Sequence, residues 1–292
     1  MYQKIIPLVL ICFLAACSSE DTSTSMSPEK PVIYTVNYPL AYFADRIAGQ
    51  QYEVVFPEME GDPAFWEPKP EALAGFQQAD WILLNGANYA KWLGQASLPQ
   101  SRMVDTSAAF ADQYIEIEGG VAHSHGDGEA HMHGVAAFTT WLNLKFAVKQ
   151  AEAIEAILDL EEAGFAALKS DLLALDQALD SAFAPLSDEP LIGSHPVYQY
   201  LAERYGLNLR SLHWEPDTMP DASMWAELES LRENHGGSIL LWEGTPLPEI
   251  VERLDGMGIQ SVVFDPCGNR PESGDFLSVM RENLNNIEAL KK

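Results

Sequence analysis

Residues 238–264 read SILLWEGTPLPEIVERLDGMGIQSVVF and contain two short apolar runs that enclose an amphipathic segment. The runs Ser238–Trp242 and Gln260–Phe264 have the length and composition of buried β-strands. Pro248–Met257, between them, has proline in its first turn and apolar residues at helical spacing, so it predicts a helix. A strand, a helix and a second strand in this order predict two parallel strands with the helix packed on the sheet.

The same alternation continues toward both ends of the chain. It predicts parallel sheets covered by helices on both faces, which is the α/β class. The further strands that we expect are Val32–Val36, Tyr52–Phe56, Trp81–Leu84, Leu191–Ile192 and Leu207–Leu212. The further helices that we expect are Pro39–Ala48, Pro70–Ala79, Leu142–Leu160, Val197–Tyr205, Asp221–Asn234 and Asp275–Leu290.

A long helix is expected between the two alternating blocks. From Phe165 to Phe183 the apolar residues recur at three- and four-residue steps, and Pro185 ends the pattern. Such a helix is roughly 30 Å long and can bridge two lobes. We therefore expect an N-terminal α/β lobe over residues 31–160, a linking helix over residues 161–185 and a C-terminal α/β lobe over residues 186–292, with a cleft between the lobes.

Composition and charge limit the possible partners. The chain has 292 residues, 47% of them hydrophobic, which is enough to bury a sizeable core in one or two domains. Its formal net charge of −26 argues against nucleic acid, because phosphate binding needs a basic face. The same charge suits a protein that attracts cations.

The first 30 residues predict targeting to a membrane. Residues 1–16 carry Lys4 and a short apolar run, as bacterial signal peptides do, and end in Leu-Ala-Ala before Cys17. This pattern resembles a lipoprotein signal, which would be cut before Cys17 and leave that residue lipidated; an ordinary secretory signal is the alternative. Residues 17–30 are polar and predict a flexible tether. Cys267 would then be alone in the mature chain, without a disulfide partner.

A histidine-rich tract lies within the first lobe, over residues 121–134 (VAHSHGDGEAHMHG). Its glycines argue against a helix or a strand. Neutral imidazole binds zinc, copper, nickel and iron, so the tract predicts contact with a transition metal. A solvated polar loop is the alternative. The four candidate ligands are His123, His125, His131 and His133.

Polar residues follow the predicted strands, and in an open parallel sheet ligands bind beyond the carboxyl ends of the strands. In the second lobe the candidate metal ligands are His195, Glu243 and Asp265, with His213 and Cys267 as weaker ones. Each has a structural alternative: His195 can cap a helix, and Asp265 before proline is common in turns. Cys267 can be a small buried apolar residue. In the first lobe, Asn37-Tyr38, Asp62-Pro63 and Asn85-Gly86 follow strands.

From about Val32 to Leu290 the chain resembles the zinc- and manganese-binding proteins of bacterial ABC importers, the cluster A-I solute-binding proteins. The resemblance rests on the tract and on VIYTVNYPLAYFADRIAGQ (32–50), GDPAFWEPKPEAL (61–73), ADWILLNGANYAKWL (79–93), GSHPVYQYLAERYGL (193–207), ILLWEGTPLPEIVERL (239–254) and VVFDPCGN (262–269). It implies two α/β lobes, a rigid linking helix and one metal ion in the cleft. It also implies a soluble or lipid-anchored binding protein that delivers the ion to a membrane permease, with the tract helping to collect it. We expect this protein to be a monomer.

The chain departs from the family pattern at two ligand positions. Ala64 and Thr139 stand where the family usually has histidine, whereas His195, Asp265 and Glu243 match residues at or near the family's metal. Zinc in a closed site takes about four N, O or S ligands. The fourth could be water, Cys267, His213 or a tract histidine.

We therefore expect a non-enzymatic zinc-binding protein on the periplasmic or outer side of a membrane, with manganese or another divalent transition metal as other possible cargo. A cleft for a metal chelate or a small organic ligand is the main alternative, and a surface metal buffer or adhesin is another. A hydrolase using Cys267, His195 and Asp265 is disfavoured, because their spacing matches no nucleophile motif.

Overall fold

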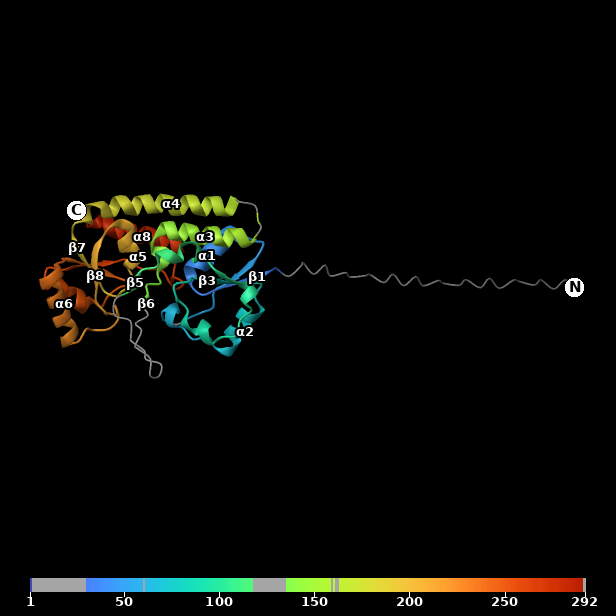
Figure 1. Ribbon diagram of the computed structural model, residues 1–292, viewed down its shortest axis with the longest axis horizontal. Helices are drawn as coiled ribbons and strands as arrows, with labels where there is room; N and C mark the ends of the chain where they lie inside the picture. The colour runs from blue at the N-terminus through green and yellow to red at the C-terminus, as the bar shows by residue number, and fades with distance from the viewer. Residues whose placement is uncertain (2–29, 60, 118–134, 159, 161–162, 291–292) are drawn as a thin grey trace.

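The computed structural model describes residues 1, 30–59, 61–117, 135–158, 160 and 163–290. They form two lobes that lie side by side (Figure 1). The first lobe has a parallel sheet in the order β2-β1-β3-β4, and the second has a parallel sheet in the order β10-β9-β7-β8. The predicted α/β class with two parallel sheets is confirmed.

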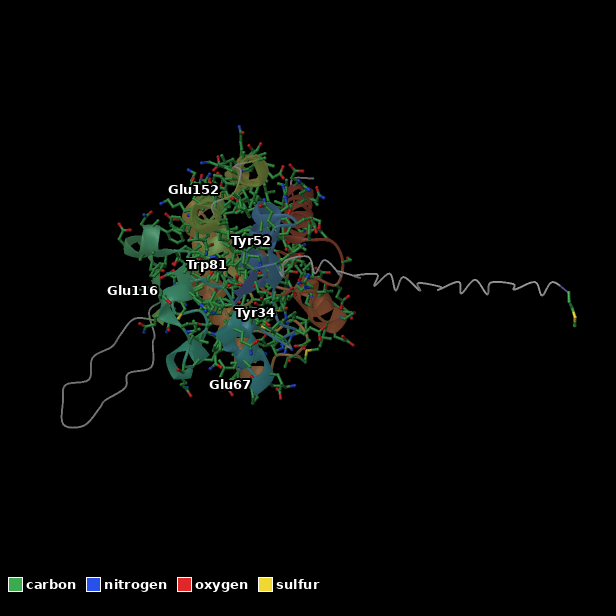
Figure 2. All side chains as sticks on the ribbon, turned by 90° about the vertical axis from the view of Figure 1, so that its right-hand side faces the viewer. Tyr34, Tyr52, Glu67, Trp81, Glu116 and Glu152 are labelled. Carbon is green, nitrogen blue, oxygen red and sulfur yellow. The ribbon has the colours of Figure 1, made fainter. Side chains whose placement is uncertain are left out.

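In the first lobe the strands are short, and the two central ones are more buried than the two edge strands. The strands are β1 (Val32–Thr35), β2 (Glu53–Val55), β3 (Trp81–Leu84) and β4 (Met103–Asp105), and the α-helices are α1 (Tyr38–Ala48), α2 (Pro70–Gln78) and α3 (Leu144–Leu158). Asn37 caps α1 by accepting a hydrogen bond from the Leu40 N–H, which fixes the turn out of β1. Of the residues labelled in Figure 2, Tyr34 and Trp81 are partly buried and pack against the core, whereas Glu67 and Glu152 are exposed.

In the second lobe every strand is followed by a helix. The strands are β7 (Pro190–Gly193), β8 (Asn208–Ser211), β9 (Ile239–Trp242) and β10 (Gln260–Val263), and the helices are α5 (Gln199–Tyr205), α6 (Ala222–His235), α7 (Pro248–Gly256) and α8 (Phe276–Ala289). Asp221 and Asp275 cap α6 and α8 through their carboxylates. The larger apolar core runs through both lobes, and a smaller cluster around Trp214, Trp225 and Trp242 belongs to the second lobe.

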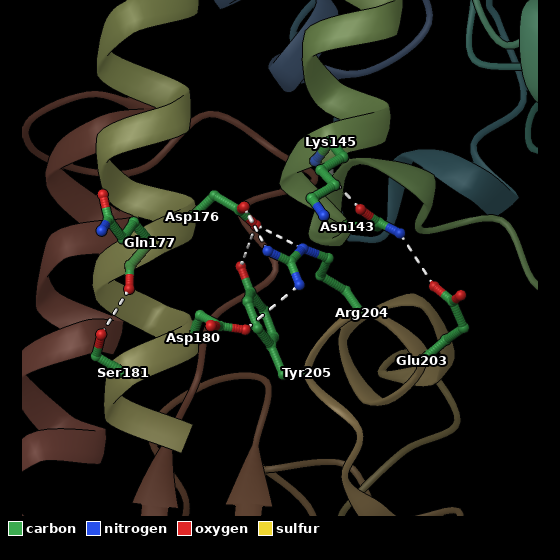
Figure 3. Close-up of polar contacts among 9 residues, drawn as sticks. All are labelled: Asn143, Lys145, Asp176, Gln177, Asp180, Ser181, Glu203, Arg204 and Tyr205. Atoms are coloured by element: carbon green, nitrogen blue, oxygen red, sulfur yellow. Dashed lines mark hydrogen bonds and ion pairs between the residues drawn. The ribbon is translucent and has the colours of Figure 1, made fainter. Parts of the chain in front are cut away.

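Helix α4 (Ala163–Phe183) runs along both lobes, beside α3 and α8 (Figure 1). Its Asp171 pairs with Arg46 of α1 at 2.7 Å. Its Asp176 accepts two hydrogen bonds from Arg204 of α5, at 2.8 and 2.5 Å (Figure 3). Ion pairs therefore attach the same helix to both lobes, and the pair between Asp176 and Arg204 is bidentate.

Two features were not predicted. The edge strand β4 is only three residues long, and a two-stranded antiparallel sheet of β5 (Glu116–Ile117) and β6 (Val135–Ala136) flanks residues 118–134. Within the described part of the chain, no helix has the length and apolarity needed to cross a bilayer.

Candidate metal centre

A cavity of about 140 Å³ lies between the two lobes. It is closed on one side by the loop after β10, whose backbone reaches the first lobe. The Trp141 indole N–H donates to the carbonyl of Pro266 at 2.7 Å, and the Tyr38 N–H donates to the carbonyl of Gly268 at 3.0 Å. The lining residues come from both lobes: Gly61, Asp62, Pro63, Tyr89, Phe138, Thr139, Trp141, Val197, Glu243, Asp265, Pro266, Gly268 and Asn269.

Three carboxylates line this cavity. Glu243 follows β9 and Asp265 follows β10, so both lie at the carboxyl edge of the second sheet. Asp62 comes from the first lobe, where it caps the 3₁₀ helix η1 (Pro63–Phe65) by accepting from the Ala64 N–H at 2.8 Å. No lysine or arginine is among the described residues that line the cavity, so its charge is negative.

Burial raises the pKa values of these carboxylates. Burial, and then the negative charges of Glu215, Asp62 and Asp265, raise the pKa of Glu243 to about 7. Burial also raises the pKa of Asp265, although a hydrogen bond from the Cys267 N–H partly opposes this. Asp62 remains open to solvent at the mouth, but the surrounding protein partly desolvates it and raises its pKa. The site therefore favours occupation by a cation.

His195, which follows β7, lies beside the cavity between two carboxylates. Its Nδ1 is 3.9 Å from Oε1 of Glu243, and its Nε2 is 3.8 Å from Oε1 of Glu215. Both distances exceed hydrogen-bond length, and Nδ1 has no hydrogen-bond partner among the described residues. Burial lowers the pKa of His195, although the negative charge of Glu215 opposes this shift. The lowered pKa favours the neutral imidazole, which is the form that binds metals.

The predicted ligands are brought together only in part. His195 is adjacent to Glu243, and Glu243 shares the cavity with Asp265. Within the described ranges, no three His, Cys, Asp or Glu side chains are arranged closely enough to hold a metal ion as they stand. The donor types, one imidazole and several carboxylates, fit zinc or manganese. A bound ion would require these side chains to move closer together.

The two departures from the family pattern occupy buried positions in the first lobe. Ala64 is 1% exposed within η1, and its methyl group cannot bind a metal. Thr139 lines the cavity, but its hydroxyl donates to the carbonyl of Val197 at 2.5 Å. In this arrangement neither residue offers an unengaged atom that could bind a metal ion.

The weaker candidates differ in accessibility. Cys267 is 2% exposed, and burial raises the pKa of its thiol, which disfavours the thiolate that zinc requires. His213 is exposed, and its ring packs edge-on against His195 with 5.8 Å between centroids. The remaining candidates lie outside the described residues: Cys17, His123, His125, His131 and His133.

Three residues near the site were not included in the predicted ligand set. Asp62 and Glu215 follow predicted strands in the sequence, and this position could have identified both as candidate ligands. Tyr89 gave no signal, because only packing shows that its side chain is 2% exposed and that its hydroxyl has no hydrogen-bond partner among the described residues.

The chain is similar in sequence to bacterial zinc-binding and manganese-transport proteins. The chain is 27% identical over 302 residues to the zinc-binding lipoprotein AdcA of Streptococcus pneumoniae, covering 96% of this chain and 58% of AdcA. It is 27% identical to the manganese ABC transporter substrate-binding lipoprotein PsaA of Streptococcus pneumoniae, covering 98% of this chain and 96% of PsaA. It is 25% identical to the high-affinity zinc uptake system protein ZnuA of Bacillus subtilis, covering 100% and 98%. The chain thus spans little more than half of AdcA but nearly all of the other two.

Solved structures agree in fold. The Zn(II)-bound ZnuA-like domain of Streptococcus pneumoniae AdcA superposes with a TM-score of 0.73 at 21% identity, covering 89% of this chain and 98% of that one. The metal-dependent lipoprotein YcdH of Bacillus subtilis gives a TM-score of 0.73 at 20% identity, with the same coverage. The family model that describes the periplasmic component A of zinc-uptake complexes matches residues 33–290. The chain belongs to this family of periplasmic zinc-uptake proteins.

Proposed function

We propose that this protein is the solute-binding component of a metal ABC importer, with zinc as its cargo. The observation that carries the proposal is the small interlobe cavity lined by Glu243 and Asp265, with His195 beside it. Relatives at 25–27% identity include zinc-binding and manganese transporter lipoproteins, which supports a divalent cation and leaves manganese as the other candidate.

The chemistry of the proposed site is binding alone, and no bond is made or broken. A neutral His195 provides a nitrogen ligand, and Glu243 and Asp265 provide oxygen ligands. All three follow strands of the second sheet, so a small shift of these loops would bring them onto one ion. The ion would replace the proton that Glu243 holds near neutral pH.

The proposed setting is the outer face of a membrane. Cys17 would carry the lipid anchor, and residues 17–30 would hold the folded lobes away from the bilayer. The tract histidines would collect the ion before it enters the cleft, and the loaded monomer would deliver it to the permease. The match to the zinc-uptake family and the lipoprotein relatives support this arrangement.

Cavity size argues against the alternative of a chelate or organic ligand. A volume of about 140 Å³ is below the roughly 300–1,000 Å³ that is common for small-molecule sites. At roughly 30 Å³ per water, it accommodates an ion with a few waters.

Calorimetric titration with zinc tests the proposal. The samples are the mature chain, a variant lacking residues 122–133 and His195→Ala. We expect one tight site that survives the deletion and is lost in His195→Ala. Loss of all binding on deletion, with the cleft residues intact, would refute a cargo site in the cleft.

A further inference from the structure

The predicted ligands His195, Glu243 and Asp265 all belong to the second lobe, yet the cavity lies between the lobes. A cation bound by one lobe alone would do little to hold the two lobes together. Asp62 is the only carboxylate from the first lobe among the described residues that line the cavity. It is therefore the group to consider as a ligand from that side.

Asp62 is held in place from both lobes. On its own lobe, its side chain caps η1 through the Ala64 N–H. From the other lobe, the Asn269 side-chain amide donates to the carbonyls of Met59 and Gly61, at 2.9 and 3.1 Å. Asn269 belongs to the same loop as Asp265, so one amide fixes the backbone before Asp62 next to the loop that carries the second lobe's carboxylate.

Tyr89 provides a second and independent observation. Its side chain is 98% buried, lines the same cavity, and its hydroxyl has no hydrogen-bond partner among the described residues. The hydroxyl oxygen lies 3.7 Å from the position that a Cβ on Gly268 would take, so it faces the Gly268 wall of the cavity. A buried hydroxyl without a partner is unfavourable. An ion that enters with its own water would provide a partner, because a water bound to a cation donates to a hydroxyl oxygen.

We propose that Asp62 is the first lobe's ligand for the cation, in place of the histidine that the chain lacks at Ala64, with the Tyr89 hydroxyl accepting a hydrogen bond from a water on the ion. The ion then bridges Asp62 and the ligands of the second lobe. This inference rests on the proposed function of the cleft. It assigns to the first lobe a carboxylate oxygen rather than an imidazole nitrogen, which gives the site a harder ligand set.

The substitution Asp62→Asn distinguishes two roles of the Asp62 side chain, that of a metal ligand and that of a helix cap. Asparagine caps helices as well as aspartate does, so the hydrogen bond to the Ala64 N–H is kept while the carboxylate is lost. Asp112→Asn is the matched control, because Asp112 is an exposed acid of the same lobe that does not line the cavity. All variants are made in the full chain, in a background where the tract cannot bind. That background carries His123→Gln, His125→Gln, His131→Gln and His133→Gln.

Two readouts are measured: the zinc Kd by competition with a chromogenic chelator, and the rise in Tm on adding zinc. For Asp62→Asn we expect a metal-free Tm within error of the parent, a zinc Kd raised by at least about tenfold, and a smaller zinc-induced rise in Tm. Asp112→Asn should match the parent in both. Cobalt(II), used as a spectroscopic probe, should show an altered visible absorption spectrum only in Asp62→Asn.

The inference is overturned if Asp62→Asn binds zinc within twofold of the parent and keeps its cobalt spectrum, while His195→Ala loses binding. That outcome leaves the proposed cleft site intact. If His195→Ala itself retains tight binding, the proposed function fails instead, and Asp62 has no cleft ion to bind. Asn269→Ala provides a second check: it removes both hydrogen bonds to the Asp62 segment and should weaken zinc binding in the same direction.

Discussion

Nδ1 of His195 lies 3.9 Å from Oε1 of Glu243, close enough to share an ion after a small shift but too far apart for a hydrogen bond. Nδ1 therefore has no hydrogen bond within the described part of the chain to break before it binds a metal. Burial and the neighbouring carboxylates raise the pKa of Glu243 to about 7, so a proton competes with a metal ion for this carboxylate. The pair therefore links ion capture to proton release.

Zinc affinity should fall as the medium becomes more acidic. Between pH 8 and pH 6 a proton competes increasingly for Glu243, so the zinc Kd should rise by about tenfold from this group alone. Chelator competition at pH 6, 7 and 8 measures it. In Glu243→Gln the affinity should be lower at pH 8 and depend less on pH. An equally steep dependence in that variant would show that another group is responsible.

The metal-free protein should be more stable at pH 5 than at pH 8. The folded-state pKa of Glu243 is raised from 4.5 to about 7, so its contribution is fully present below 4.5 and is lost as the pH rises through 7. The shift corresponds to about 3 kcal/mol. Thermal melts of metal-free protein across this range should show the decrease, and Glu243→Gln should reduce it. Glu71→Gln, an exposed acid on α2, is the control and should leave the profile unchanged.

Asp176 should contribute far more to stability than Asp180, although both pair with Arg204 (Figure 3). The Asp176 side chain is 7% exposed and accepts hydrogen bonds from Arg204 and Tyr205, whereas that of Asp180 is 60% exposed. Asp176→Ala leaves Arg204 without its buried partner and should lower the free energy of unfolding by about 3–5 kcal/mol. Asp180→Ala should change it by less than about 1 kcal/mol. Urea unfolding compares the two, and equal losses would contradict this assignment.

Cys267 should be dispensable for zinc binding. Its thiol is buried, the pKa of the thiol is raised by that burial, and Cys267 is not among the described residues that line the cavity. Cys267→Ala should therefore keep the zinc Kd within about twofold, since a buried thiol that stays protonated is not a ligand. A loss of tenfold or more, with unchanged Tm, would make Cys267 the missing ligand.

Much of the fold was predictable because its signals are local. The run Trp81–Leu84 became β3 with the predicted bounds, and Pro248 begins α7 as predicted. The edge strand β4 was missed because three residues carry little periodicity. The expected helix over residues 161–185 is α4, Ala163–Phe183, in the described structure.

The site was less predictable, because its geometry depends on how the lobes pack. Position after a strand was enough to identify His195, Glu243 and Asp265 as candidates. It did not show that Asp62 of the first lobe shares a cavity with Asp265, since Asn269 establishes that contact across about 210 residues of sequence. The sequence also did not identify Tyr89, because only the packing shows that its hydroxyl has no hydrogen-bond partner among the described residues.

The most direct test is anomalous diffraction at the zinc absorption edge from crystals of the zinc-loaded chain. We expect one strong peak in the interlobe cavity, within about 2.2 Å of a ring nitrogen of His195 and of carboxylate oxygens of Glu243 and Asp265. An oxygen of Asp62 should complete the site from the first lobe. A cavity without a peak, or a peak bound only by the tract histidines, would contradict the central claim that the cleft holds the cargo.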